Sequence, residues 1–488
     1  MIRPVGALLI AAGLLAGCSP SVAPQASADL ADRLAGQVTV DAMVAHLNRL
    51  QEIADTHRGN RADGTPGFDA GAEYVANTLR DKGFDVTTPE FSRLDTTSPG
   101  NPTLTVAGRG YPVDQASLLV STPPSGVTGP LVRPARPMGC AAAEYPASTP
   151  RGAIAVTDDV GCSIIDKQDA AAAHGAVALI VVSRHSRSGP PAGLFPAGYY
   201  DRLTLPVAVV GGDGDAALHR AAGPVRLVLD AKTVKTVSRN VLAQTKTGFE
   251  HDVVLVGAQL DGPAAGPGIN DNGSAVAAVL ETAVALGPSP SVTNAVRFAF
   301  WGAQERQLGG SSDYVFGLDR DRLNDIALYL NFDMLASPNA GFFTYDGDQS
   351  ASPSRDVMPE DVPAGSAGIE RTLAGYLNLA GKRPADMPLS GVKDYGPFLV
   401  AGVPIGGITT GASQRKTTVQ ARLWGGQAAA PFDPNYRGVH DTVANINRDA
   451  LAITGSGVAF AVGSYAQSID GPNGVAPRDK RHRTPLGP

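Results

Sequence analysis

Short apolar runs alternate with a helix-like segment between residues 253 and 332, and this alternation limits the possible fold more than any other feature of the chain. Val253–Gly257, Ala295–Trp301 and Ile326–Phe332 are mostly apolar, as buried strands are, and Ser274–Leu286 has the length and composition of an apolar helix. Strands that alternate with helices build α/β domains with parallel strands. In such domains the functional loops follow the carboxyl ends of the strands. We therefore predict an α/β domain with its site at that edge of the sheet.

The chain has 488 residues, which is more than one compact domain usually holds. From residue 111 to residue 232 the sequence changes to short apolar runs separated by Gly and Pro, which predicts a small β-rich domain with one or two helices. We place this domain, 111–232, as an insertion in an α/β domain made of residues 38–110 and 233–472. The runs expected to be its strands are Leu118–Val120, Ala153–Val156, Ala176–Val182 and Val207–Val210. Residues 473–488 are Pro-rich and basic without apolar periodicity, which predicts a disordered tail.

Residues 1–17 have the layout of a secretory signal peptide. Arg3 precedes an apolar run, Val5–Leu15, that is too short to span a bilayer and ends in small residues. The run closes with Leu15-Ala16-Gly17-Cys18, which resembles a bacterial lipobox and implies cleavage before Cys18 and lipidation of that residue. We expect residues 18–37 to be a flexible tether that holds the protein in the cell envelope, on the outer face of the cytoplasmic membrane. The alternative is an ordinary signal peptide in which Cys18 is a buried residue.

Two further cysteines, Cys140 and Cys162, remain once Cys18 is set aside. An exported chain enters an oxidising compartment, where an even pair of cysteines is expected to form a disulfide. The alternative is two free, buried thiols.

The charges of the chain exclude some classes of partner. Lys and Arg number 40 and Asp and Glu number 46, which gives a formal net charge of −6, and neither sign forms a long block. Such a chain is not expected to bind nucleic acid or an anionic lipid surface. We expect contact with the membrane through the lipid anchor alone, and a monomeric protein.

Carboxylates follow three consecutive predicted strands, and these segments form the candidate site. The first strand is followed by Gln259-Leu260-Asp261 and by Gly268-Ile269-Asn270-Asp271-Asn272-Gly273-Ser274. The second leads into Trp301-Gly302-Ala303-Gln304-Glu305, and the third into Asn331-Phe332-Asp333-Met334. A single acidic strand end is more often a helix cap than a ligand. Three in succession at one edge of a sheet indicate an active site.

These segments, in this order, resemble those of the bacterial di-zinc aminopeptidases that carry a protease-associated domain inserted in the peptidase domain, relatives of glutamate carboxypeptidase and the transferrin receptor. The resemblance extends from about residue 38 to residue 470 and includes the disulfide-bearing segments at Cys140 and Cys162. It implies a zinc-exopeptidase-like α/β fold, in which a mixed sheet is flanked by helices and a small β-rich protease-associated domain is inserted.

The resemblance also assigns roles to four acidic residues. Asp271 matches the ligand that bridges the two metals in the family. Glu305 and Asp333 match further metal ligands, and Asp261 matches an aspartate that lies just behind the ligands. The resemblance therefore implies that these carboxylate positions of the family's two-metal site are kept in this chain.

Three positions depart from the family pattern. Where the family has its first His ligand this chain has Gln259, and where the family has its catalytic Glu this chain has Gln304. In Phe432-Asp433-Pro434-Asn435-Tyr436-Arg437, the final His ligand is replaced by Arg437. Zinc prefers nitrogen and sulfur donors beside carboxylates, so the loss of both imidazoles weakens two zinc positions at once. An amide has no basicity near neutral pH, and the loss of a general base costs a factor of roughly 10² to 10⁴ in rate.

Positive charge near the carboxylates is a further expectation. An unfilled cluster of Asp271, Glu305 and Asp333 is costly unless a cation or protons compensate. The guanidinium of Arg437 can bond to one of these carboxylates and would repel a metal. Lys393 lies in a segment that borders the family's substrate pocket, and it adds positive charge.

The sequence leaves two functions open. The first is a cell-envelope lipoprotein of the aminopeptidase family that has lost peptide hydrolysis, holds no metal or a weakly bound divalent metal, and binds a peptide or protein. The second is an active metallo-aminopeptidase with two zinc ions in an altered site, rebuilt with His440 or with His251. We expect His251 to lie at the end of its strand away from the ligands. A purely structural envelope protein is a third possibility, against which an open cleft beside Asp271 would speak.

Overall fold

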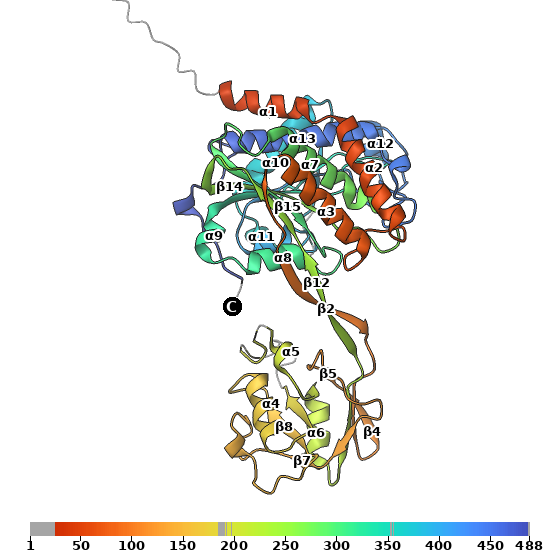
Figure 1. Cartoon of the computed structure of the whole chain (residues 1–488), viewed down its shortest axis with the longest axis vertical. Coiled ribbons are helices and arrows are strands. Elements are labelled where there is room, and N and C mark those ends of the chain that lie inside the picture. Colours follow the sequence, from red (N-terminus) through yellow and green to blue (C-terminus); the bar gives the residue numbers. More distant parts are fainter. Residues whose placement is uncertain are drawn as a thin grey trace, which may run out of the picture. The chain divides into compact units, whose positions relative to one another are not determined.

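The computed structural model describes residues 25–183, 191, 193–196, 198–351, 354 and 356–486. Cys18 and the predicted signal peptide lie outside these residues. The chain divides into two compact units (Figure 1). The first unit consists of the residues up to Pro89 and those from Asn240 onward, and the second unit is Glu90–Arg239. The inserted unit is longer at both ends than predicted, because β2 (Glu90–Ser98) pairs with β12 (Lys232–Arg239) and both belong to the insertion.

The first unit is built on a six-stranded mixed sheet with the order β1-β13-β15-β14-β16-β19. β14 is parallel to both β15 and β16, and β16 is parallel to β19, whereas β13 is antiparallel to β15 and β1. The three strands predicted from the sequence are the parallel centre of this sheet. The strands are β1 (Asp85–Thr87), β13 (Val241–Gln244), β14 (Phe249–Gln259), β15 (Asn294–Trp301), β16 (Ile326–Phe332) and β19 (Ile405–Gly406). A smaller sheet joins β17 (Phe343–Tyr345), β18 (Ala385–Met387) and β20 (Ile408–Thr409).

Helices cover both faces of the large sheet, and each face has its own hydrophobic core. Helices α2, α3, α7, α10 and α13 pack on the face to which Val254 and Val256 point. Helices α8, α9 and α11 pack on the opposite face, to which Leu255 points, because successive strand residues alternate between faces. The helices are α2 (Val40–Thr56), α3 (Pro66–Asp81), α7 (Ser274–Leu286), α8 (Gly309–Phe316), α9 (Arg320–Asp325), α10 (Gly365–Leu379), α11 (Gly396–Val400), α12 (Thr418–Trp424) and α13 (Arg448–Gln467).

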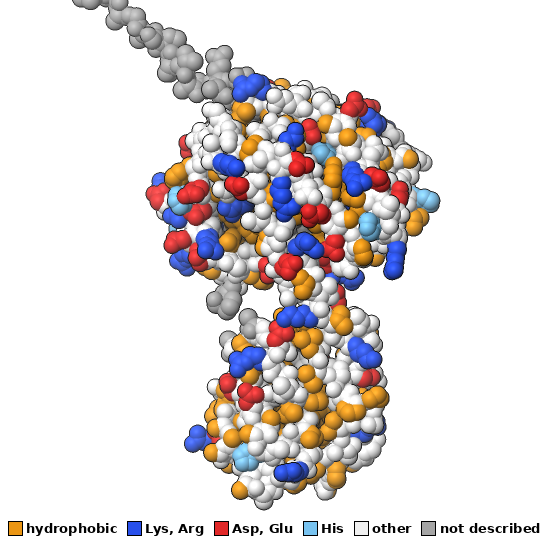
Figure 2. All heavy atoms as spheres, viewed as in Figure 1, with side chains coloured by type: hydrophobic (Ala, Val, Ile, Leu, Met, Phe, Trp, Pro, Cys, Tyr) orange, Lys and Arg blue, Asp and Glu red, His pale blue; other side chains and the backbone are white. Residues whose placement is uncertain are grey.

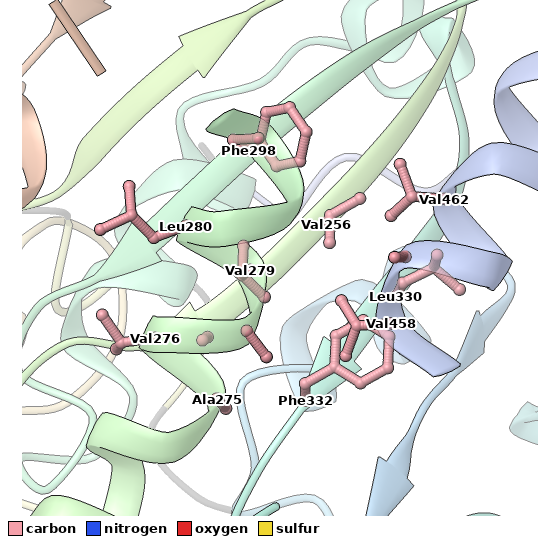
Figure 3. Packing of buried hydrophobic residues seen from close by; sticks show 14 of the residues in the cluster. Val256, Ala275, Val276, Val279, Leu280, Phe298, Leu330, Phe332, Val458 and Val462 are labelled. Atoms are coloured by element: carbon pink, nitrogen blue, oxygen red, sulfur yellow. The ribbon is translucent and has the colours of Figure 1, made fainter. Parts of the chain in front are cut away.

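The core beneath α7 and α13 fixes the central strands in place. Figure 3 shows Val256, Phe298 and Leu330 from three neighbouring strands beside Val279 of α7 and Val458 of α13. All five side chains are fully buried. Full burial of such a side chain stabilises the fold by about 1.5–3 kcal/mol, so the strand ends that carry the site rest on a firmly packed base.

Two terminal segments differ from the predictions. Part of the expected tether forms α1 (Gln25–Gln37), which packs on α13 and buries Ala31 and Leu34. The segment has few large apolar residues, so its periodicity was too weak to predict a helix. The end of the chain is also ordered up to residue 486, because Arg481 and Arg483 are buried and donate to carbonyl groups of the first unit.

The second unit contains a five-stranded sheet, β5-β10-β9-β8-β7, and a four-stranded antiparallel sheet, β4-β3-β11-β6. Cys140 and Cys162 form a disulfide, as predicted. The prediction of a strand at Leu118–Val120 is wrong, because this segment forms a turn. The strands are β3 (Thr103–Val106), β4 (Arg109–Pro112), β5 (Asp114–Gln115), β6 (Val127–Gly129), β7 (Leu131–Val132), β8 (Ile154–Asp158), β9 (Ala178–Val182), β10 (Val207–Val210) and β11 (Val225–Val228). The helices are α4 (Ile164–Ala173), α5 (Tyr199–Arg202) and α6 (Gly212–Arg220).

The surface carries charges of both signs. On the face of the molecule in Figure 2, acidic and basic side chains are interspersed. Among the described residues, no helix has the length and apolar composition needed to cross a bilayer.

Candidate active site

The register of the central strands brings the predicted site segments together. Gln259 at the end of β14 lies opposite Trp301 at the end of β15, and Ala258 lies opposite Phe332 at the end of β16. The loops that follow these ends therefore begin side by side. They carry the retained carboxylates of Asp261, Asp271, Glu305 and Asp333.

The loop that carries Asp271 is held in place by a buried arginine. Arg61, which is 1% exposed, donates to the carbonyl oxygens of Leu260 (2.9 Å), Pro267 (3.2 Å) and Gly268 (2.8 Å). Burial lowers the pKa of Arg61 to about 10, so it stays charged at neutral pH. Gly268 has φ +63°, and a Cβ there would lie 2.6 Å from the carbonyl oxygen of Asp271. The loop therefore needs both the arginine and a glycine.

A second carboxylate fixes the backbone at Asp271. Asp441 accepts hydrogen bonds from the backbone N–H groups of Asn270 (2.6 Å) and Asp271 (3.0 Å). The amide of Asn270 in turn donates to Asp433 (2.7 Å) and to the hydroxyl of Ser337 (3.0 Å). The peptide bond between Asp271 and Asn272 is cis. The two hydrogen bonds to Asp441 hold the backbone from which the Asp271 side chain projects.

Asp261 and the two substituted glutamine positions form a connected layer behind the carboxylates. Asp261 is fully buried and accepts from the backbone N–H groups of Gln304 (2.9 Å) and Glu305 (3.2 Å). Burial raises the pKa of Asp261 to about 8. The amide nitrogen of Gln259 donates to the carbonyl of Asp261 (3.1 Å) and lies 3.4 Å from Glu305 Oε1. The amide of Gln304 donates to the carbonyl of Val392 (3.4 Å), so neither glutamine offers a basic group to the site.

Lys393 is paired with Asp333. Its ammonium group donates to Asp333 Oδ2. Burial acts to lower the pKa of Lys393, but the carboxylates of Asp333 and Asp271 outweigh burial and hold this pKa well above its usual value. Lys393 is therefore a fixed positive charge beside Asp333.

Arg437 reaches the other two carboxylates. Its Nη2 lies 2.5 Å from Glu305 Oε2, and its Nε lies 3.8 Å from Asp271 Oδ2. The guanidinium carbon also lies 5.3 Å from the centre of the Tyr436 ring, within the range of a cation–π contact. Half of the Arg437 side chain, 49%, is exposed.

Two carboxylate oxygens of the site lack a hydrogen-bond donor. Asp271 Oδ2 and Asp333 Oδ1 are buried and accept no hydrogen bond from the described part of the chain. The 3.8 Å between Asp271 Oδ2 and Arg437 Nε is an ion-pair distance and is too long for a hydrogen bond. Burial and the repulsion from Asp333 raise the pKa of Asp271 well above its usual value, while Lys393 acts in the opposite direction. The site therefore still has acceptors for a donor from outside.

The side chains present do not fit zinc. No imidazole or thiolate reaches the three carboxylates among the described residues, and two cations are bonded to the carboxylates instead. Among the described residues, a group of three side chains that could hold a metal ion lies elsewhere, at Asp346, Asp348 and Glu370. The ligand atoms of these three residues lie within 4.8 Å of one another. Their oxygens already accept backbone N–H groups. The retained carboxylates alone do not form such a cluster.

The histidines considered for a rebuilt site form no hydrogen bond or ion pair with its carboxylates among the described residues. His251 is near the start of β14 and lies 2.9 Å from Asp325, at the opposite end of the strand from Gln259, as expected. His440 is exposed, and its carbonyl oxygen accepts from Thr442 and Asn445. Neither arrangement replaces a lost ligand.

Arg61, Asn270 and Asp441 support the site. Asn270 lies in one of the predicted site segments, whereas no sequence pattern predicted the roles of Arg61 and Asp441. Arg61 lies outside the strand-end segments, and Asp441 follows a loop with no apolar periodicity. Lys393 was expected only to add positive charge, and its contact with Asp333 depends on the path of the loop before α11. An alignment of related chains would be needed to find such residues from sequence.

Comparisons with known proteins agree with this fold. Peptidase family M28 matches residues 240–462, and the PA domain matches residues 127–218. The chain is 49% identical over 477 residues to "Probable lipoprotein aminopeptidase LpqL" of Mycobacterium tuberculosis, which covers 96% of this chain and 94% of that protein. It is 36% identical over 436 residues to an aminopeptidase of Pseudomonas aeruginosa, with 86% and 79% of the two chains covered.

Solved structures show the same fold. The aminopeptidase from Aneurinibacillus sp. strain AM-1 has a TM-score of 0.51 at 21% identity and covers 92% of this chain and 98% of its own. The zinc aminopeptidase BSAP from Bacillus subtilis has a TM-score of 0.50 at 23% identity and covers 88% and 96%. The predicted α/β fold with a protease-associated insertion is confirmed.

Proposed function

Because the chain belongs to peptidase family M28, we propose that it is a cell-envelope lipoprotein that keeps the family's fold, has lost peptide hydrolysis, and binds a peptide or protein ligand. The observation that carries this proposal is the pairing of the site's carboxylates with the chain's own cations. Lys393 is bonded to Asp333, and Arg437 is bonded to Glu305.

The loss of hydrolysis rests on what the site's side chains can do. Gln304 stands where the family has its general base, and its amide donates to a backbone carbonyl. An amide takes no proton near neutral pH, and general-base catalysis contributes roughly 10² to 10⁴ in rate. The donor set also lacks the imidazoles that zinc prefers, so the site holds no metal or only a weakly bound divalent cation.

Binding rests on the two buried oxygens without a donor. Asp271 Oδ2 and Asp333 Oδ1 can accept hydrogen bonds from the ammonium group of a peptide with a free amino end. The half-exposed Arg437 side chain has to move aside to admit this group. Val392 and Val439, close in sequence to the two cations, are 67% and 63% exposed and offer apolar surface to a ligand side chain.

The envelope location rests on the sequence and on one relative. Leu15-Ala16-Gly17-Cys18 resembles a lipobox, and the 49% identical relative is named a lipoprotein. A Cys18→Ser variant is expected to leave the membrane fraction for the soluble one, whereas the wild-type protein stays with the membrane. Equal amounts of both proteins in the membrane fraction would contradict the lipid anchor.

The loss of activity is tested on the whole mature protein purified without chelator. We expect well under one zinc ion per chain by elemental analysis and no cleavage of aminoacyl-nitroanilides. A zinc content of about two ions per chain, together with chelator-sensitive cleavage of the aminoacyl-nitroanilides, would contradict the proposal.

Binding is tested with a matched pair of peptides, one with a free amino end and one with the same sequence acetylated. Calorimetry should detect the free peptide only. Asp271→Asn should weaken its binding at least about tenfold, since a charge-assisted hydrogen bond contributes about 1.5–3 kcal/mol. Asp41→Asn, a change on an exposed pair with Arg448, is the control and should leave binding unchanged. Equal binding of both peptides would contradict recognition of the amino end.

The second candidate is an active metallo-aminopeptidase with an altered metal set. It is favoured by the aminopeptidase names of the relatives that cover most of this chain. It predicts the zinc content and the chelator-sensitive cleavage that the first proposal excludes, so the same two measurements decide between them.

A further inference from the structure

We propose that Lys393 and Arg437 are the permanent counter-ions of this site, and that their side chains make its three retained carboxylates independent of divalent metal. The family implies a two-metal centre at these carboxylates, and the residues of this chain disagree with it. The inference concerns how the charge of the site is balanced, and it holds whether or not a peptide binds.

Arg437 occupies the position of a shared cation. Its Nη2 lies 2.5 Å from Glu305 Oε2 and its Nε lies 3.8 Å from Asp271 Oδ2, so one planar group stands between two carboxylates. The contact of its guanidinium with the Tyr436 ring, at 5.3 Å, holds the group over the site. A guanidinium stays protonated at every physiological pH, and it cannot leave the site by losing its charge.

Lys393 compensates the third carboxylate. Its ammonium group is bonded to Asp333 Oδ2 and lies close enough to Asp271 to interact with it electrostatically. Lys393 reaches the site from the loop before α11, whereas Arg437 comes from the loop after α12. Two separate segments therefore supply one cation each, Lys393 to Asp333 and Arg437 to Glu305 and Asp271.

The two cations leave little room for a metal. A dication placed among Asp271, Glu305 and Asp333 would meet two positive charges within a few ångströms, where the repulsion is strong.

The test removes the two cations and asks whether a metal replaces them. We would compare the wild-type protein with Lys393→Met, Arg437→Met and the double variant. Arg448→Met is the matched control, because Arg448 is 51% exposed and pairs with the exposed Asp41 away from the site. Metal content after incubation with Mn²⁺ and dialysis, and the thermal midpoint with chelator or with excess Mn²⁺, are the readouts. Mn²⁺ is the probe because it suits an all-oxygen site.

The wild-type protein and the Arg448→Met control should retain no stoichiometric metal, and their midpoints should be the same with chelator and with Mn²⁺. The double variant should have a lower midpoint in chelator, because its carboxylates then repel one another. Mn²⁺ should raise this midpoint, since an ion that binds only the folded state stabilises it. About one Mn²⁺ ion per chain should remain after dialysis.

Two results would overturn the inference. One is a wild-type protein that holds stoichiometric metal and loses stability when chelator removes it. The other is a folded double variant that is indifferent to Mn²⁺. If the double variant does not fold, Arg437→Met decides, because its side chain is half exposed and its loss opens no core cavity. It should bind Mn²⁺ at least about tenfold more tightly than the wild-type protein, and equal affinity would contradict the proposal.

Discussion

Arg437 Nη2 lies 2.5 Å from Glu305 Oε2, so the residue found where the family resemblance predicts a histidine ligand is bonded to one that matches a predicted carboxylate ligand. Lys393 is bonded in the same way to Asp333. Carboxylates that lose a metal repel one another unless another cation compensates. Lys393 and Arg437 therefore compensate two of the three carboxylate charges of the site.

Restoring the expected ligands without removing Lys393 should not restore a metal centre. The triple change Gln259→His, Gln304→Glu and Arg437→His leaves Lys393 on Asp333, so we expect less than the about two zinc ions per chain of a two-metal hydrolase. Adding Lys393→Met should raise the zinc content and the chelator-sensitive cleavage of aminoacyl-nitroanilides. If the triple variant already binds about two zinc ions, Lys393 is no obstacle to metal. If the fourfold variant binds none, the pocket has changed beyond its ligands.

Arg61 should be essential for the loop that presents Asp271. Arg61→Met leaves the carbonyl groups of Leu260 and Pro267 buried without a donor, whereas the carbonyl of Gly268 keeps the backbone N–H of Gly273. At about 1–3 kcal/mol for each orphaned group, we expect the free energy of unfolding to fall by at least about 2 kcal/mol. Urea unfolding measures this change. Arg58→Met, on the exposed turn nearby, is the control and should change stability by less than about 0.5 kcal/mol.

The sequence predicted the parts of the fold that local patterns encode. The predicted bounds of α7 and β16 equal the observed ones, because an apolar run between turn residues has little freedom in how it can be buried. The gathering of Asp271, Glu305 and Asp333 at one edge follows from the parallel strand order.

The remaining features depend on contacts between distant segments. The tail from residue 473 has the composition of a disordered segment, yet Arg483 is buried and donates to the carbonyl of Ile326 at 2.9 Å. No local sequence pattern predicts that an arginine will donate a hydrogen bond to a buried carbonyl group that is distant in the sequence. The same holds for Lys393 and Asp333, whose contact requires the path of a whole loop.

The first helix should be part of the folded unit rather than of a tether. Leu34 is 1% exposed and belongs to the main core beside α13. Leu34→Ala should lower the free energy of unfolding by about 3 kcal/mol, within the range of buried leucine truncations. Gln37→Ala, at an exposed position of the same helix, is the control and should have little effect. If the two variants are equally stable, α1 does not contribute to the fold.

Glu370 should make the stability of the protein depend on pH. It is 6% exposed on α10, its Oε2 accepts the N–H groups of Gly347 and Asp348, and Asp346, Asp348 and Asp386 lie around it. Burial, with repulsion from Asp348 and Asp386, raises the pKa of Glu370 to about 7. A carboxyl group whose pKa is raised on folding binds a proton more tightly in the folded state. Its contribution is complete below about pH 4.5 and is lost as the pH rises to about 7.

Glu370→Gln keeps an oxygen acceptor for both N–H groups and removes the titration. Relative to this variant, the wild-type protein should lose stability progressively between about pH 4.5 and pH 7, by up to about 3 kcal/mol. Urea unfolding at several pH values measures the difference. Glu360→Gln, at an exposed position, should follow the wild-type protein at every pH. A difference between wild type and Glu370→Gln that is constant across this range would contradict the raised pKa, because only a group that titrates within the range changes the difference with pH.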